Sequence, residues 1–74
     1  NKSETPKLFP NPSSEFIQIS GLTRKRNYII YNMLGSKIKR GTISNKEDID
    51  LKSLVNGIYL LKFDNVNTIK FIKE

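Results

Sequence analysis

The sequence of 74 residues contains no cysteine and no histidine, and only seven of its residues are acidic. Without cysteine the chain can form neither a disulfide bond nor a thiolate metal site, although the compartment stays open because many exported bacterial domains also lack cysteine. A catalytic nucleophile would have to be a serine or threonine activated by lysine, and no serine lies in a Gly-x-Ser-x-Gly context. We therefore expect a protein that is not an enzyme and that binds no cofactor.

Long hydrophobic segments are also absent. No apolar run approaches the roughly 20 residues that span a bilayer, and no segment has the form of a signal peptide. We expect a domain that does not span the membrane, with any export signal upstream of this segment. The chain opens at Asn1 rather than at methionine, so we interpret it as a piece of a longer polypeptide. Its size corresponds to one small domain, in which a large active-site cleft is not expected.

Acidic residues cluster in one place, at Glu47, Asp48 and Asp50. Such a group could in principle bind a hard cation such as calcium, which takes about six to eight oxygen ligands. The internal glycine of a loop-type calcium site is missing, so we predict no metal site. We expect these carboxylates to pair instead with a base such as Arg40 or Lys46.

Basic residues number 13 and give a net charge of +6. No acid lies between Phe16 and Lys46, a stretch whose bases are Arg24, Lys25, Arg26, Lys37, Lys39, Arg40 and Lys46. This positive field favours an anionic partner such as a nucleic acid, a lipid head group or an acidic polysaccharide, but it equally suits a solubilising surface. Because no RRM, KH or cold-shock signature accompanies the bases, we do not expect a nucleic-acid partner.

Short apolar segments alternate with turn residues along the whole chain. No stretch of ten residues keeps a helical period, although residues 51–55 could form a single turn. The spacing predicts an all-β sandwich or barrel. The expected strands lie at residues 15–20, 27–33, 37–43, 48–51, 58–63 and 68–73, with a seventh at 7–9 if that segment pairs at an edge.

The segment Pro10-Asn11-Pro12 comes immediately before the first of these longer strands. Each proline fixes its own φ angle and lacks an N–H group, and each biases the residue before it toward extended geometry. The segment therefore predicts a rigid lead into a β domain.

Other turn signals lie between later strands. Gly35 separates two strand segments and is expected to adopt a positive φ in a tight hairpin. The dipeptide Asn56-Gly57 suits a primed turn, and residues 64–67 suit the last hairpin loop. Tyr59 lies in the apolar run after Gly57, in alternation with Leu61 and Phe63, and is expected in the core, so its hydroxyl needs a hydrogen-bond partner.

Four segments, taken in order, resemble one known family. They are Leu-Phe-Pro-Asn-Pro at 8–12, Ile-Tyr-Asn-Met-Leu-Gly at 30–35, Ile49 to Tyr59 with its Asn-Gly-Ile-Tyr end, and Thr-Ile-Lys-Phe-Ile-Lys at 68–73. Together they resemble the type A C-terminal sorting domain of proteins secreted by the type IX system of Bacteroidetes. The resemblance covers residues 8–74 and implies an immunoglobulin-like β-sandwich of about seven short antiparallel strands, with residues 1–7 as a flexible linker to upstream cargo.

The resemblance also implies a function. A domain of this family directs its parent protein through the outer-membrane translocon, in transit from the periplasm to the cell surface or the medium. Its implied partners are the translocon, its sortase and shuttle components, and anionic lipopolysaccharide where the cargo is attached to the surface. Sortase cleavage is expected within residues 1–7. An immunoglobulin-like accessory module for adhesion or sugar binding is the alternative, because sandwiches host many functions.

The residues expected to carry sorting and translocon recognition are Pro10, Asn11, Pro12, Gly35, Gly57, Tyr59, Lys70, Ile72 and Lys73. The prolines and glycines also have structural roles, whereas Lys70 and Lys73 lie where the recognition signal of the family concentrates. If the last strand forms a sheet edge, a partner could read it by strand addition, although edge lysines also serve to prevent aggregation. We expect a monomer, with edge-strand dimers possible in a crystal.

Overall fold

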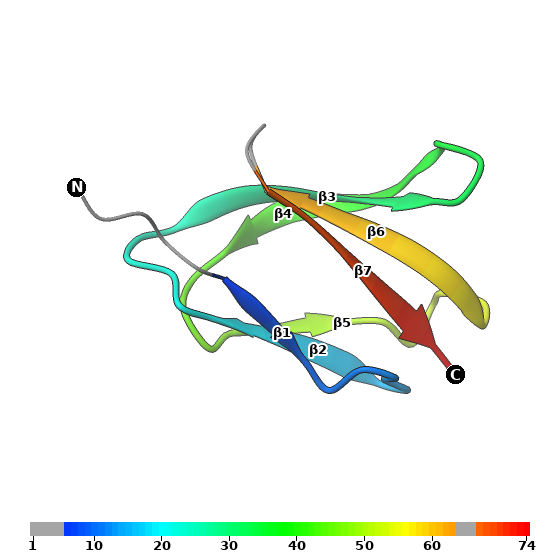
Figure 1. Cartoon of the computed structure of the whole chain (residues 1–74), viewed down its shortest axis with the longest axis horizontal. Helices are drawn as coiled ribbons and strands as arrows, with labels where there is room; N and C mark the ends of the chain where they lie inside the picture. Colours follow the sequence, from blue (N-terminus) through cyan, green and yellow to red (C-terminus); the bar gives the residue numbers. More distant parts are fainter. Residues whose placement is uncertain (1–5, 64–66) are drawn as a thin grey trace.

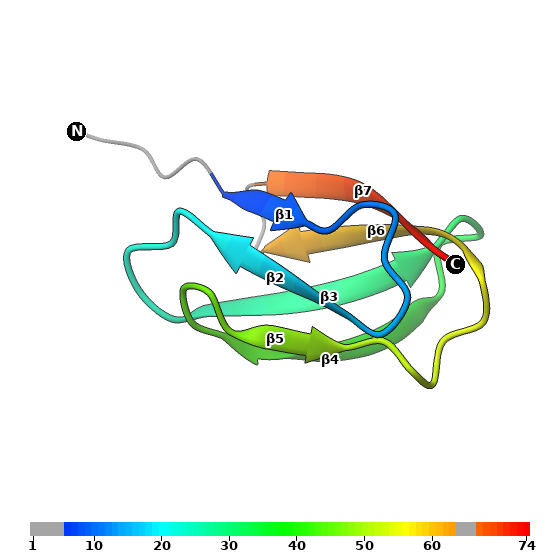
Figure 2. The same ribbon diagram turned by 90° about the horizontal axis from the view of Figure 1, so that it is seen from below.

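The computed structural model describes residues 6–63 and 67–74, and these form two antiparallel β-sheets without a helix. The three-stranded sheet has the order β1-β2-β5 and the four-stranded sheet the order β4-β3-β6-β7. The sheets lie one above the other, which confirms the predicted all-β sandwich (Figures 1 and 2). The strands are β1 (Lys7–Phe9), β2 (Phe16–Ser20), β3 (Arg26–Asn32), β4 (Lys37–Ile43), β5 (Asp48–Asp50), β6 (Gly57–Phe63) and β7 (Asn67–Lys73).

The strand boundaries agree with the sequence pattern to within about one residue. The short strand expected at 7–9 exists and pairs with β2 through Leu8 and Ile19. None of the described residues belongs to a helix that is long and apolar enough to cross a membrane. The stretch 51–55 forms a hydrogen-bonded turn, in which the Leu54 amide donates to the Leu51 carbonyl oxygen (3.0 Å).

The core lies between the two sheets and follows the period of two expected for strands. On β3 the inward residues Tyr28 and Ile30 are buried, while Ile29 and Tyr31 are half-buried on the outer side. Burial of a large apolar side chain contributes about 1.5–3 kcal/mol, so the inward positions dominate the stability. The core residues are Ile17, Ile19, Leu22, Tyr28, Ile30, Ile43, Ile49, Leu51, Leu54, Tyr59, Leu61, Phe63 and Phe71.

Gly35 lies in the hairpin between β3 and β4 with φ +87°, as predicted. The Asn32 side chain organises this turn, because its Oδ1 accepts hydrogen bonds from the amides of Leu34 and Ser36, both at 2.9 Å. The Gly35 amide donates to the Asn32 carbonyl oxygen (3.0 Å). A Cβ at Gly35 would meet nothing within 4 Å, so the requirement for glycine comes from the backbone conformation alone.

The primed turn predicted at Asn56-Gly57 is wrong. The strands on either side, β5 and β6, belong to different sheets, so the connection crosses the sandwich instead of forming a hairpin. Gly57 has φ +157° and begins β6, and Asn56 does not have the positive φ that a type I′ turn requires. The last predicted loop, at 64–67, lies mostly outside the described residues. The strands on either side of it, β6 and β7, are paired, and Phe63 with Asn67 is the pair nearest the loop.

Candidate functional site

Asn11 joins the beginning of the fold to its last strand. Its side-chain Oδ1 accepts a hydrogen bond from the Ile72 amide (3.0 Å), and its Nδ2 donates to the Lys70 carbonyl oxygen (3.4 Å). The asparagine thus bonds residues that follow it by 59 and 61 positions in the chain. One side chain here takes the place of a backbone partner on the outer edge of β7.

Ser13 continues this pairing with its backbone. Its amide donates to the Ile72 carbonyl oxygen (2.9 Å), and its carbonyl oxygen accepts from the Glu74 amide (2.7 Å). The two bonds form a parallel bridge between Ser13 and Lys73, and only 3% of Ser13 is exposed. Residues 11–13 therefore act as a short extra strand beside the C-terminal half of β7, where the loop after β1 runs in Figure 2.

The prolines shape this segment without adding donors of their own. Pro10 and Pro12 are exposed and both follow cis peptide bonds. Since proline has no N–H group, neither proline leaves a donor without a partner at this edge. We define the junction as residues 10–13 together with residues 70–74.

The side chains of the last strand divide between the two faces of the sheet. Lys73 lies on the inward side with Phe71, is 8% exposed, and donates from Nζ to Asn56 Oδ1 at 3.5 Å. Lys70 and Ile72 lie on the outward side, where Ile72 is 40% exposed. Of the three residues expected as contacts on this strand, Lys70 and Ile72 present their side chains to solvent.

Tyr59 and Phe71 support the junction from beneath. Tyr59 is buried, and its ring stacks on Phe71 with the centroids 5.7 Å apart. Its hydroxyl donates to the Val55 carbonyl oxygen (2.6 Å), so the expected partner of this buried hydroxyl is present. Tyr59 is a core residue that cannot touch a partner directly in this conformation.

The two glycines named from the sequence lie at different distances from the junction. Gly57 pairs with Lys73 in the register of β6 and β7 and therefore adjoins the junction. Gly35 lies in the β3–β4 hairpin, and β6 separates β3 from β7. The structure thus brings together Pro10, Asn11, Pro12, Gly57, Lys70, Ile72 and Lys73, with Tyr59 beneath them, and leaves Gly35 apart.

Ser13 and Asn56 belong to this arrangement but were missed by the sequence reasoning as site residues. Ser13 lies between a proline and a second serine in a polar stretch, and no periodicity marks it as buried. Asn56 carried a signal, the Asn-Gly dipeptide, but that signal indicated a turn instead of a partner for Lys73.

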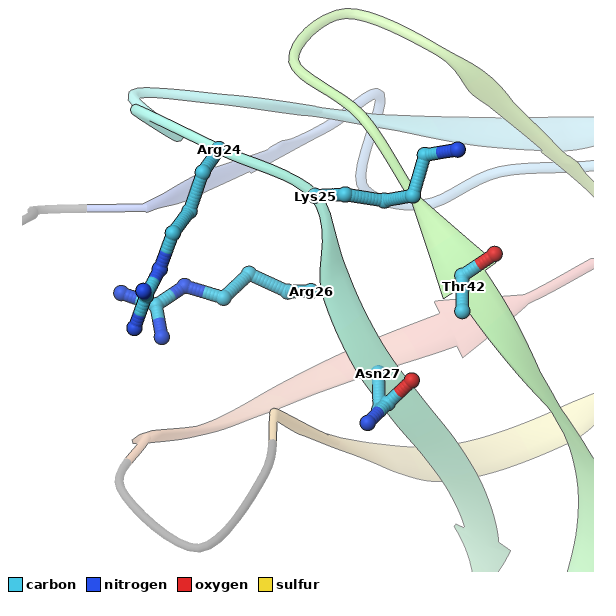
Figure 3. A pocket seen from close by; sticks show the side chains of 5 residues that line it. All are labelled: Arg24, Lys25, Arg26, Asn27 and Thr42. Atoms are coloured by element: carbon cyan, nitrogen blue, oxygen red, sulfur yellow. The ribbon is translucent and has the colours of Figure 1, made fainter.

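The bases between Phe16 and Lys46 are distributed over the start of β3, strand β4 and the loop after β4. Arg24, Lys25 and Arg26 lie at the start of β3 and line a pocket of about 280 Å³ together with Asn27 and Thr42. In Figure 3 the side chains of Arg24 and Arg26 extend toward the same side, and that of Lys25 extends over β4. The remaining bases lie on β4 and in the loop after it.

The acidic cluster makes local hydrogen bonds. Glu47 accepts from the Ser44 amide (2.7 Å), Asp48 from Gln18 Nε2 (2.7 Å) and Asp50 from the Lys52 amide (2.9 Å). All of these residues lie in the described part of the chain, where no ion pair links the three carboxylates to Arg40 or Lys46, so the expected pairing is wrong. The backbone and Gln18 are closer partners because they lie on the same turns or on the adjacent strand. No group of three acidic, histidine or cysteine residues among the described ones could hold a metal ion.

Comparison with known proteins identifies a family. The model of a family described as the secretion system C-terminal sorting domain matches residues 7–74. Searches of curated proteins and of solved structures gave no match. The matched region includes both parts of the junction, the segment at 10–13 and the last strand.

Proposed function

Because this chain belongs to the family of secretion system C-terminal sorting domains, which direct their parent proteins through the type IX system, we propose that the secretion machinery recognises it at the junction. Membership confirms the sorting domain predicted from the sequence, and the comparison lends no support to an accessory binding module. The role of the family is export to the cell surface or the medium. We further propose that the parent protein crosses the periplasm on the way.

The observation that carries this proposal is the pair of hydrogen bonds that the Asn11 side chain makes with the last strand, accepting from the Ile72 amide and donating to the Lys70 carbonyl oxygen. They place the Pro-Asn-Pro segment beside the two outward side chains of the last strand. Two of the four segments that resemble the family thereby become one continuous surface. One receptor could contact the Pro-Asn-Pro segment and the last strand at the same time, although these segments lie at opposite ends of the sequence.

The pairing of the outer edge of β7 limits how a partner can bind this surface. Strand addition needs free backbone N–H and C=O groups along a sheet edge. Around Ile72 and Glu74 these groups already pair with Asn11 and Ser13. We therefore propose that the machinery first contacts the side chains of Lys70 and Ile72, and that strand addition at this half of β7 would require displacement of residues 11–13.

Later steps concern the linker and the cargo. We propose that the sortase cleaves within residues 1–7, with shuttle components as partners of the exported protein and lipopolysaccharide as an acceptor where cargo stays attached. Strand β1 begins at Lys7, which supports a cut on the N-terminal side of the sandwich. Intact-mass measurement of the released domain checks this, and a cut inside the sandwich would refute it.

The test of recognition is a fluorescent reporter fused to the domain in a host with an active type IX system. Lys70→Ala/Ile72→Ala removes both outward side chains, while Lys52→Ala/Val55→Ala makes the same kind of change at exposed positions of the β5–β6 loop. We expect the first variant to lower export at least about tenfold, which corresponds to about 1.4 kcal/mol of lost binding. The control should be exported normally, and thermal unfolding should show that both variants remain folded.

Normal delivery of the folded Lys70→Ala/Ile72→Ala variant would contradict the proposal. Deletion of residues 71–74 is a weaker test, because Phe71 is fully buried and stacks on Tyr59. Loss of a buried phenylalanine costs about 3–5 kcal/mol, so the truncated domain is expected to unfold. Its failure to be exported would then say nothing about recognition.

A further inference from the structure

The outward side of the four-stranded sheet carries two kinds of side chain. The strand register forms one row of Lys37, Tyr31, Leu60 and Lys70 and a second row of Arg40, Ile29, Lys62 and Thr68. Ile58 and Ile72 lie opposite each other at the end of this surface. These ten residues are called the outer face below.

The apolar residues of the outer face lie on β3, β6 and β7, where Tyr31 is opposite Leu60 and Ile58 is opposite Ile72. An antiparallel sheet that faces water on one side normally alternates apolar inward residues with polar outward ones. Here five outward positions are apolar; Ile58 is 42% exposed and Ile72 is 40% exposed. In Figure 1 the other sheet lies on one side of β3, β6 and β7, and no described strand covers the opposite side. Contiguous apolar surface with a polar rim is characteristic of interaction sites.

The charge of the outer face has one sign. Lys37, Arg40, Lys62 and Lys70 contribute four positive charges, and no carboxylate belongs to this set of described residues. The acidic side chains of β5 lie in the other sheet. Two copies stacked through this face would place cations against cations, which is unfavourable. The complementary surface therefore combines apolar side chains with negative charge.

We propose that the outer face docks on a protein surface that carries carboxylates around an apolar centre. The proposal rests on the sorting function, because the domain would meet such a partner during export. It extends the recognised surface from the junction across the whole four-stranded sheet. A protein fits better than a lipid bilayer because three of the five apolar side chains, those of Ile29, Tyr31 and Leu60, are half-buried in the sheet. Interfacial insertion requires apolar groups that reach about 5–10 Å into the membrane.

Arg40 and Lys62 allow the outer face to be tested apart from the junction. They flank Ile29 in one row and do not belong to residues 10–13 or 70–74. Arg40→Glu/Lys62→Glu reverses both charges, and Arg24→Glu/Lys25→Glu makes the same net change beside the pocket of Figure 3. Arg40→Gln/Lys62→Gln neutralises the charges and replaces the charge-reversed variant in the experiment if that variant fails to fold.

The experiment places the photo-crosslinking residue benzoylphenylalanine at Tyr31 of the reporter fusion in the type IX host. We expect a crosslink to a protein with an acidic surface, reduced at least about tenfold by Arg40→Glu/Lys62→Glu and retained in the Arg24→Glu/Lys25→Glu control. Substitution of lysine for the crosslinked partner's carboxylates should restore the crosslink to the reversed face.

Other outcomes would overturn the proposal. These are a crosslink to a second copy of the domain, a crosslink that is insensitive to Arg40→Glu/Lys62→Glu, or no crosslink while the fusion is exported. Charge-dependent sedimentation with phosphatidylglycerol vesicles, without a protein crosslink, would assign the face to lipid and equally refute it. Failure of the unaltered fusion to leave the cell would count against the sorting function itself, so the two failures are distinguishable.

Discussion

Tyr28 shows how a single buried residue is constrained by its neighbours. It points inward from β3, and a Cβ added at Gly41 would lie only 3.3 Å from its hydroxyl oxygen. Burial raises the pKa of Tyr28 above its ordinary value of about 10, and the nearby Glu47 carboxylate raises the pKa further. The folded state therefore holds this proton more tightly than the unfolded state does.

This raised pKa predicts a loss of stability in alkali. Below about pH 10 the hydroxyl is neutral in both states and its contribution is fully present. As the pH rises toward the pKa of the folded state, the unfolded state releases the proton first and the free energy of unfolding falls. We expect Tyr28→Phe to make this alkaline decline shallower in urea unfolding between about pH 8 and about pH 11.

The matched control is Tyr31→Phe, which makes the same chemical change on the outward side of β3. We expect the decline in Tyr31→Phe to remain steeper than in Tyr28→Phe. Equal slopes in the two variants would show that the burial of Tyr28 does not control the alkaline unfolding.

Strand β7 illustrates how one element is completed by a distant segment. It is last in the order of its sheet, yet the C-terminal half of its outer edge pairs with residues 11–13. Open sheet edges favour association with other chains, and covering such an edge lowers that risk. The Pro-Asn-Pro segment thus protects the strand that it helps to present.

Loss of the Asn11 side chain should open this edge locally. Asn11→Ala removes the bonds to the Ile72 amide and the Lys70 carbonyl group, and we expect the free energy of unfolding to fall by about 1 kcal/mol. Urea unfolding measures the loss, and hydrogen exchange at the Ile72 amide should become faster. Asn11→Asp keeps an acceptor for Ile72 and is expected to show an intermediate effect.

Ser14→Ala, in the same loop, provides the comparison, since Ser14 is exposed and makes no hydrogen bond that holds β7. We expect its exchange rate at Ile72 to match that of the unaltered domain. An unchanged rate in Asn11→Ala would show that the side chain does not protect the edge.

At the scale of the whole molecule, the net charge of +6 acts over a body of 37 × 21 × 17 Å. At about 0.01 M ionic strength the screening length is about 30 Å, so bases on different faces repel one another, whereas at about 0.15 M it is about 8 Å. Excess charge of one sign destabilises the compact state through this repulsion. Moderate salt should therefore stabilise the domain.

We expect the Tm to rise by about 4 °C when the ionic strength increases between these limits, which corresponds to about 1 kcal/mol in a domain of this size. Differential scanning calorimetry measures the change. Lys37→Gln/Lys62→Gln removes two cations from the outer face and should reduce the increment. A Tm that is independent of salt, or that falls, would mean that local attractions outweigh the net repulsion.

Local features of this fold were predictable because their causes are local. The strand Lys37–Ile43 was predicted with its observed boundaries, and the Gly35 turn has the expected positive φ. Period-two alternation and the steric freedom of glycine both act over a few residues. The Asn56-Gly57 prediction was wrong because the choice between a hairpin and a crossing connection depends on which sheet receives the next strand.

The amino-acid sequence by itself determined that the chain forms short strands in an all-β sandwich, where its tight hairpin lies, and which family it belongs to. Only the tertiary structure decided that Asn11 bonds the last strand, that Lys73 points inward, and that Lys62 and Lys70 join Lys37 and Arg40 on one face. Strand formation depends on neighbours along the chain. The register between strands depends on how distant segments pack into a shared core. The order of residues along the chain does not show which distant segments will meet.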